Sequence, residues 1–310
     1  MGAAATAVST IQVRARSELR ENSAAVMSAS QAGILFTIND SGNDAVLFAL
    51  DTAGNDRGAW HVRGARNMDW EAAGLGPCGP RAGGADAPGD ARPQPGSRAA
   101  GQCLYIGDVG DNAGSRPTRV IYRLPEPRAL APGTMGTVTA ERLEFRYADR
   151  PHDVEGLWVG GDGTIWLITK RRLRAPEGPD RRALIFALDA GVWNHPDSVA
   201  TARLADSIPV VPGSAPGRMI TDAALSHDGK RIAFRTYTEV FVFDADSATG
   251  RVVSPLASAV CNITGLRERQ GEGITWLGTS GRLLLTSEGN GSPMHIITCE
   301  SPGGAPQRPN

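Results

Sequence analysis

Residues 154–170, VEGLWVGGDGTIWLITK, decide the fold of this chain. An acidic residue, Glu155, stands at the head of an apolar stretch, and a glycine-rich turn separates that stretch from a second one. Short apolar runs bounded by turn residues are typical of buried β-strands. A third apolar run follows at residues 183–190 (ALIFALDA), so this unit holds at least three strands.

The same unit occurs five times along the chain, which predicts a repeat architecture. Each copy begins with an acidic or amide residue and a small residue, and apolar strands follow. The copies are spaced by roughly 50 residues or more, which is the length of a propeller blade. The residues at the heads of the units are Asn22, Glu71, Glu155, Asp222 and Glu272.

The repeat predicts an all-β protein, a β-propeller of five blades in one domain over residues 1–300. The last unit runs out of chain before its outer strand, so residues 6–15 are expected to supply that strand and close the ring. Six blades would require a degenerate blade within residues 190–218, where three prolines favour a loop. A β-sandwich is the other alternative, although it does not predict five copies of one acidic position. Outer strands are expected at residues 57–63, 137–146, 198–204 and 251–256.

Composition sets further limits on this chain. The chain holds 38 Gly and 21 Pro, which suits strands and turns. Its 32 basic and 33 acidic residues give no overall field for nucleic acid or anionic lipid, and no apolar run approaches the length of a membrane span. We therefore expect a monomer that binds neither nucleic acid nor membrane.

Residues 74–102 are expected to be a low-complexity insertion and residues 301–310 a disordered tail.

The repeated acidic position predicts a metal centre. The first strand of each blade lines the central channel, so the five head residues are expected to converge there. Crowded carboxylates must protonate or share a cation, and Ca²⁺ tolerates an irregular oxygen cage. The alternative is that the acids hold channel water or pair with arginine. The predicted metal ligands are Asn22, Glu71, Glu155, Asp222 and Glu272.

A second group of polar residues follows the ends of the second strands, at the mouth of the channel. Its mixture of carboxylates and cations suits a small anionic or polyhydroxy substrate beside a metal. Ordinary turn chemistry is the alternative for its Asn and Asp residues. The predicted substrate-binding residues are Asn39, Asp40, Asp111, Asn112 and Glu288, and the predicted catalytic residues are Asp108, Asp153, Lys170, Arg171 and Arg235.

The layout resembles the calcium-activated nucleotidase (apyrase) family, a five-bladed propeller with one axial calcium. The resemblance covers about residues 21–288, places the family's calcium ligands at the five head residues, and matches its basic pair to Lys170, Arg171 and Arg172 (ITKRRL). Asn22 and Asp222 replace serine-type ligands, and the remaining substrate loops do not match. DWEAAG, GDVGDN, DVEGL, FRTY and QGEGI also resemble a group of uncharacterised, often exported bacterial propellers, and lactonase and phytase-like propellers are more weakly similar.

These features lead to two main hypotheses of function. The first is a calcium-dependent hydrolase of a phosphorylated or otherwise anionic substrate. The second is a non-catalytic propeller that recognises a ligand or a protein partner and holds a structural metal. A five-bladed glycosidase with two channel carboxylates is the third and weakest hypothesis, since it has no use for the cationic residues.

The four cysteines bear on the compartment. Disulfides Cys78–Cys103 and Cys261–Cys299 would suit a periplasmic or secreted protein, and four buried thiols would suit a cytoplasmic one. Residues 1–10 lack the basic and continuous apolar regions of an export signal. The sequence leaves both compartments open.

Overall fold

The structure is a computed structural model that describes residues 3–4, 6–79, 101–170, 182–208 and 219–299. Most of the predicted insertion and the predicted tail lie outside these ranges, although both ends of the insertion belong to strands. Besides one short 3₁₀ helix, η1 (Ala190–Asn194), the regular elements of the described residues are strands. The strands are β1 (Ala3–Ala4), β2 (Thr6–Ile11), β3 (Ala24–Met27), β4 (Ile34–Ile38), β5 (Val46–Asp51), β6 (Asp56–Arg63), β7 (Trp70–Pro77), β8 (Gln102–Asp108), β9 (Arg119–Pro125), β10 (Met135–Thr139), β11 (Glu141–Tyr147), β12 (Val154–Val159), β13 (Ile165–Thr169), β14 (Ala183–Leu188), β15 (Ala200–Ile208), β16 (Ile220–Leu225), β17 (Arg231–Thr236), β18 (Glu239–Asp244), β19 (Ala259–Asn262), β20 (Gly271–Leu277), β21 (Arg282–Ser287) and β22 (Met294–Thr298).

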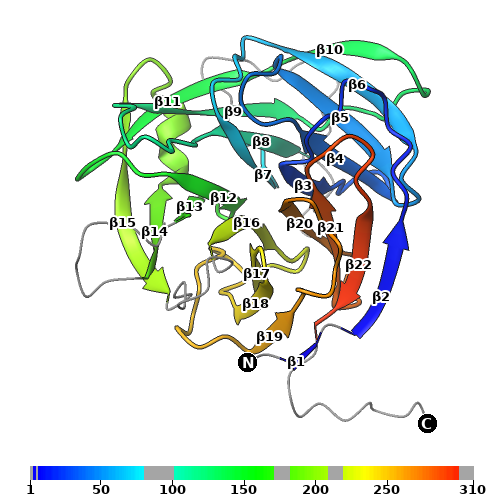
Figure 1. Cartoon of the computed structure of the whole chain (residues 1–310). Helices are drawn as coiled ribbons and strands as arrows, with labels where there is room; N and C mark the ends of the chain where they lie inside the picture. The colour runs from blue at the N-terminus through cyan, green and yellow to red at the C-terminus, as the bar shows by residue number, and fades with distance from the viewer. Residues whose placement is uncertain (1–2, 5, 80–100, 171–181, 209–218, 300–310) are drawn as a thin grey trace.

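Within the described ranges, antiparallel pairing groups the strands into five arrays of four. Figure 1 shows the arrays placed around a central axis, with the first strand of each array innermost. The five inner strands contact one another in a closed ring. The fold is a β-propeller, as the sequence predicts. From the inner strand outward the arrays are β3-β4-β5-β6, β7-β8-β9-β11, β12-β13-β14-β15, β16-β17-β18-β19 and β20-β21-β22-β2.

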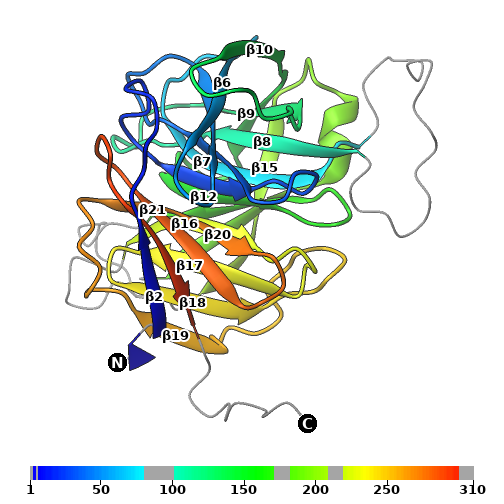
Figure 2. The same cartoon turned by 90° about the vertical axis from the view of Figure 1, so that its right-hand side faces the viewer.

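The N-terminal strand completes the last array. β2 pairs antiparallel with β22, for example Thr10 with His295, and Figure 2 shows the two strands side by side. This pairing hides the outer edge of β22, which would otherwise be an unpaired sheet edge. Both predicted disulfides are present, and Cys261–Cys299 ties β19 to the end of β22 next to this closure.

Two of the predicted outer strands differ from the structure. Residues 137–146 belong to two strands: β10 pairs in parallel with β6 of the first array, and β11 pairs antiparallel with β9. The fourth array uses β19 as its outer strand, in place of the predicted residues 251–256. That stretch contains Pro255, which has no backbone N–H to donate to a ladder. β11 and β15 also pair in parallel, so the second and third arrays share one eight-stranded sheet.

Apolar side chains between neighbouring arrays form the core. Trp70, Trp166 and Trp276 are among the buried side chains. Trp276 Nε1 donates a hydrogen bond to the backbone oxygen of Ala224 at 2.8 Å, which joins the last two arrays. In the described residues, no helix is long and apolar enough to span a membrane.

Candidate functional site

Four of the five inner strands, β7, β12, β16 and β20, have an irregular register near their first residues. The pairing of β7 with β8 skips Glu71, and the pairing of β12 with β13 skips Glu155. In β20 the register shift falls at Glu272 and Gly273. A β-bulge takes its extra side chain out of the regular alternation between the two faces of a sheet. Both faces of each inner strand pack against neighbouring blades, so the bulges direct Glu71, Glu155 and Glu272 toward one end of the channel. We call this end, which these three glutamates mark, the mouth.

Lys170 lies beside these buried glutamates. Its Nζ contacts Glu155 Oε1 at 2.7 Å. Glu272 Oε1 accepts hydrogen bonds from Tyr237 Oη at 3.1 Å and Gln270 Nε2 at 2.8 Å. The other oxygens, Glu155 Oε2 and Glu272 Oε2, are buried without a hydrogen-bond partner in the described residues. Since an unpartnered buried oxygen is costly, these two atoms point to a ligand that supplies the missing interaction.

Burial and mutual repulsion set the charge of the mouth. Burial raises the pKa of Glu71 well above its usual range, and the neighbouring Glu155 raises it further. Burial also raises the pKa of Glu155 and of Glu272. Burial opposes the charge of Lys170, but the Glu155 carboxylate outweighs it and holds the lysine pKa above its ordinary value. One ammonium group therefore faces several carboxyl groups that repel one another.

Glu71 also belongs to a group of three carboxylates at the mouth. One oxygen each from Asp40, Asp69 and Glu71 lie within 4.8 Å of one another, which is close enough for one metal ion. Asp40 follows β4 and Asp69 precedes β7, so the first two arrays build this group together. Gly110 makes room for it, because a Cβ there would lie 2.6 Å from Asp69 Cγ and 2.7 Å from Glu71 Cγ.

The half-buried carboxyl groups of the mouth also hold protons unusually tightly. Burial and the charge of Asp40 raise the pKa of Asp69 to about 6. Burial, together with Glu272, Asp40 and Glu21, raises the pKa of Glu288 to about 8. Burial is the largest cause of both pKa shifts, and repulsion between neighbouring carboxylates adds to it; a bound cation would relieve that repulsion.

The head residues of the first and fourth units have other partners. Asn22 Oδ1 accepts a hydrogen bond from Thr37 Oγ1 at 2.5 Å. Asp222 is fully buried, and its two oxygens accept the backbone N–H groups of Ala223 and Ile274, each at 2.7 Å. Asp222 therefore joins β16 to β20. The residue skipped in the β16 pairing is Thr221, whose hydroxyl is buried and has no partner in the described part of the chain.

Arg235 has a structural position. Its Nη1 donates to the backbone oxygens of Gly273 and Thr286, each at 2.7 Å, and its Nη2 pairs with Glu268. The side chain is fully buried between the fourth and fifth arrays. These contacts give the guanidinium a structural role between the two arrays, and its predicted catalytic role stays a prediction.

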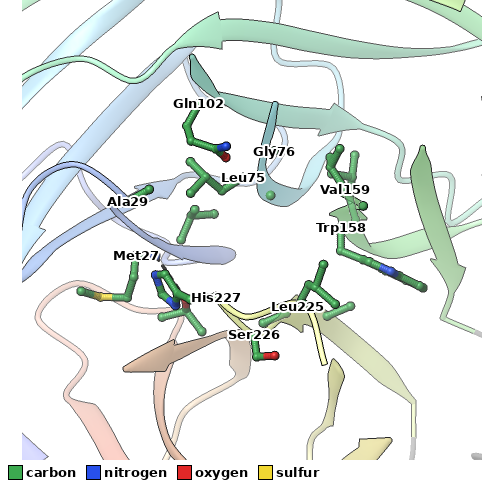
Figure 3. A pocket seen from close by; sticks show the side chains of 18 of the residues that line it. Met27, Ala29, Leu75, Gly76, Gln102, Trp158, Val159, Leu225, Ser226 and His227 are labelled. Atoms are coloured by element: carbon green, nitrogen blue, oxygen red, sulfur yellow. Dashed lines mark hydrogen bonds between the residues drawn. The ribbon is translucent and has the colours of Figure 1, made fainter. Parts of the chain in front are cut away.

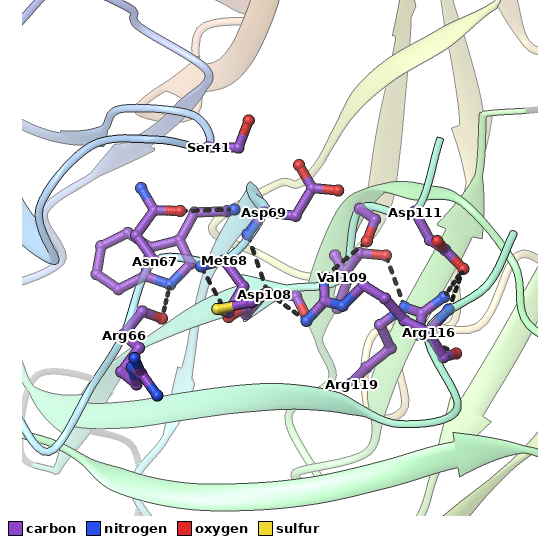
Figure 4. A network of polar contacts seen from close by, with 12 residues as sticks. Ser41, Arg66, Asn67, Met68, Asp69, Asp108, Val109, Asp111, Arg116 and Arg119 are labelled. Atoms are coloured by element: carbon purple, nitrogen blue, oxygen red, sulfur yellow. Dashed lines mark hydrogen bonds and ion pairs between the residues drawn. The ribbon is translucent and has the colours of Figure 1, made fainter. Parts of the chain in front are cut away.

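Asp108 and Asp111 are likewise engaged in a buried network, shown in Figure 4. Asp108 pairs with Arg116 at 2.6 Å and accepts the backbone N–H of Asp69 at 3.1 Å. Asp111 pairs with Arg119 at 2.5 Å. In Figure 4 the Asp69 carboxylate points away from the Asp108–Arg116 ion pair. The network thus holds the backbone of Asp69 in place, and the Asp69 carboxylate is free of the network and belongs to the carboxylate group at the mouth.

The remaining predicted residues differ in their surroundings. Asn39 accepts the backbone N–H groups of residues 20 and 21, so it shapes a loop. Asp153 Oδ1 accepts the Asp111 N–H at 2.8 Å, and its Oδ2 is buried without a partner in the described residues. Asn112 is exposed in a turn, and Arg171 lies outside the described residues.

Sequence reasoning missed Asp69 and Thr221. A repeated Asp-x-Glu pattern, Asp69 with Glu71 and Asp153 with Glu155, was the available signal for the first. Thr221 follows the buried apolar Ile220, just as Glu71 follows Trp70, so the apolar residue marks the register better than the acidic one.

The residues of the mouth fit a hard divalent cation. Asp40, Asp69 and Glu71 offer carboxylate oxygens, which are the ligands that Ca²⁺ prefers. The two unpartnered buried oxygens, Glu155 Oε2 and Glu272 Oε2, are also suited to accept a cation or a molecule bound to it. The fit therefore favours a metal centre formed by Asp40, Asp69 and Glu71 over one shared by all five head residues.

Comparisons with known proteins bear on the fold alone. No protein-family model and no curated protein matches this sequence. Glutaminyl cyclase of Myxococcus xanthus is similar with a TM-score of 0.47 and 14% identity, over 95% of this chain and 97% of that chain. The Cps50 (Swd1) β-propeller domain of Myceliophteria thermophila is similar with a TM-score of 0.40 and 11% identity, over 93% of this chain and 99% of that chain. Virginiamycin B lyase of Staphylococcus aureus is similar with a TM-score of 0.40 and 11% identity, over 89% of this chain and 65% of that chain. None of these similarities assigns an activity, and the resemblance to the apyrase family stays a prediction.

Proposed function

We propose that this protein is a calcium-binding β-propeller whose channel mouth binds a small anionic ligand. The observation that carries the proposal is the group formed by Asp40, Asp69 and Glu71, each of which places one carboxylate oxygen within 4.8 Å of the others. The pKa of Asp69, raised to about 6, supports an excess of negative charge at the same place. When bound, Ca²⁺ would supply the positive charge and the open coordination positions that an anionic ligand needs.

Calorimetric titration of chelator-treated protein with Ca²⁺, alongside a thermal melt, tests this proposal. We expect one ion per chain and a rise in melting temperature, since binding to the folded state alone adds about 2.7 kcal/mol at a hundredfold excess over Kd. Asp69→Asn should weaken binding strongly because it removes a charged ligand. Asp197→Asn is the matched control, since Asp197 is exposed on the loop before β15. Equal affinity in the wild type and Asp69→Asn would refute the site.

Hydrolysis of the anionic ligand is the second candidate function, and Asp153 favours it. Its Oδ2 is buried without a described partner, so it can accept a proton from water, while Oδ1 is held by the Asp111 N–H. Lys170 lies close by and can stabilise developing negative charge. Glu288, with a pKa raised to about 8, keeps a proton near neutral pH and can donate it to a leaving group.

A panel of nucleotides, phosphomonoesters, lactones and esters, assayed with calcium-loaded protein, separates catalysis from recognition. Asp153→Asn should lower the rate by about 10²-fold or more and leave Ca²⁺ binding in place. If the calcium-loaded wild type hydrolyses none of the panel, the hydrolase proposal fails and the proposal of a non-catalytic recognition propeller remains.

The two disulfides favour a protein that functions in an oxidising compartment outside the cytoplasm.

A further inference from the structure

A cavity of about 440 Å³ lies around the later residues of the five inner strands, away from the acidic mouth at their heads. Figure 3 shows it from close by, with Leu75 and Gln102 from the second array, Val159 from the third and Leu225 from the fourth around it. Its volume falls within the range of sites that bind small molecules. The channel therefore has two chemically different ends.

The lining of this cavity is almost free of charge. Among the described residues that line it, none is Asp, Glu, Lys or Arg and His227 is the one titratable side chain, whereas carboxylates crowd the mouth. Apolar side chains such as Met27, Leu75 and Leu225 form much of the wall. The hydroxyl of Thr275 already accepts the Met27 N–H at 3.1 Å. The half-buried amide of Gln102 is a polar group at the rim that can meet a ligand.

Close packing and a disulfide hold two of the strands around this cavity. Gly76 lies so close to β12 that a Cβ there would be 2.4 Å from Val159 Cγ1. Disulfide Cys78–Cys103 fixes the ends of β7 and β8, the strands that carry Leu75 and Gln102. A pocket held open in this way does not have to be ordered when a ligand binds, which favours affinity.

We propose that this cavity binds one uncharged small molecule with an apolar body, with a polar end group at Gln102. Burying a charged group here would be costly, because the described lining holds no carboxylate, lysine or arginine to act as a counter-charge and His227 is its one titratable side chain. Apolar contact with Leu75 and Leu225 removes those surfaces from water, which is the favourable contribution. The site is independent of the calcium centre, since no carboxylate lines it.

Binding of the neutral fluorophore N-phenyl-1-naphthylamine, followed by displacement with octanol, octanoate and octylammonium, tests this proposal. The three competitors share one chain and differ in head-group charge. We expect saturable binding at one site per chain, displaced at least tenfold better by octanol than by either ion. Ca²⁺ should leave the affinity unchanged. Equal displacement by the charged competitors, or absence of saturable binding, would overturn the proposal.

Variants locate the site. Leu75→Trp fills the cavity and should weaken binding at least tenfold, and Leu225→Trp should do the same from the opposite wall. Leu256→Trp is the matched control, because Leu256 is 74% exposed, and it should change the affinity less than twofold. Unchanged affinity in a folded Leu75→Trp or Leu225→Trp protein would place the fluorophore elsewhere and refute the site. Circular dichroism shows which variants are folded.

Discussion

Replacement of Arg235 by methionine should destabilise the propeller strongly, although the sequence presents this arginine as a catalytic residue. The guanidinium joins β17 to β20 and β21 through the carbonyl groups of Gly273 and Thr286, and it pairs with Glu268. Methionine keeps an apolar stem and removes all three interactions. The variant therefore separates a structural role from a role at the channel mouth.

The structure sets the expected magnitude. Removing one partner of a buried ion pair costs about 3–5 kcal/mol, because the other charge is left uncompensated. Glu268 meets that condition, since its side chain is 7% exposed. The two carbonyl groups that lose their donor add about 1 kcal/mol or more. A loss of about 4 kcal/mol or more in the free energy of unfolding follows, which is a large part of the stability of a typical domain.

Equilibrium unfolding in urea at neutral pH measures this loss. Arg282→Met is the matched control, because Arg282 is exposed on β21, and it should stay within about 0.5 kcal/mol of the wild type. The double variant Arg235→Met/Glu268→Leu should recover much of the loss, since it leaves no buried charge behind. A loss below about 1 kcal/mol in Arg235→Met, or no recovery in the double variant, would refute the reasoning.

Three further predictions follow from buried groups. Asp222→Ala should cost about 2 kcal/mol or more in urea unfolding, because two buried backbone N–H groups lose their acceptor, and a cost near zero would contradict the inter-strand role. The calcium-free protein should lose stability as pH rises from about 5 to 8, because the raised pKa values of Asp69 and Glu288 keep protons on the folded chain that the unfolded chain releases earlier. Glu288→Gln should flatten the melting temperature against pH in calorimetry, and an unchanged slope would count against this cause. Replacing Cys261 and Cys299 by serine should cost up to about 4 kcal/mol, from the 38-residue separation that the disulfide bridges, and a melting temperature equal to the wild type would show that the bond adds no stability.

The sequence by itself determined the fold and which glutamates stand at the head of the inner strands. Five apolar units led by an acidic or amide residue predict a propeller, because strand period and turn residues are local properties. The closing strand near the N-terminus also follows from the sequence, since the last unit lacks a strand, whereas the sequence left disulfides and free thiols as alternatives and the structure contains both disulfides. Glu71, Glu155 and Glu272 were placed at the channel for the same reason.

Only the tertiary structure decided which polar residues meet. The bulge in β16 takes Thr221 as its extra residue and leaves Asp222 to hold β20, a shift of one residue that residue type alone does not reveal. The sequence predicts a catalytic role for Arg235, and the structure pairs it with Glu268 and with carbonyl groups of two other strands, all more than 30 residues away along the chain. Asp69 lies near Asp40 because the segments after β4 and before β7 come together where the first two arrays are neighbours. Such contacts depend on the placement of whole blades, which no local pattern encodes.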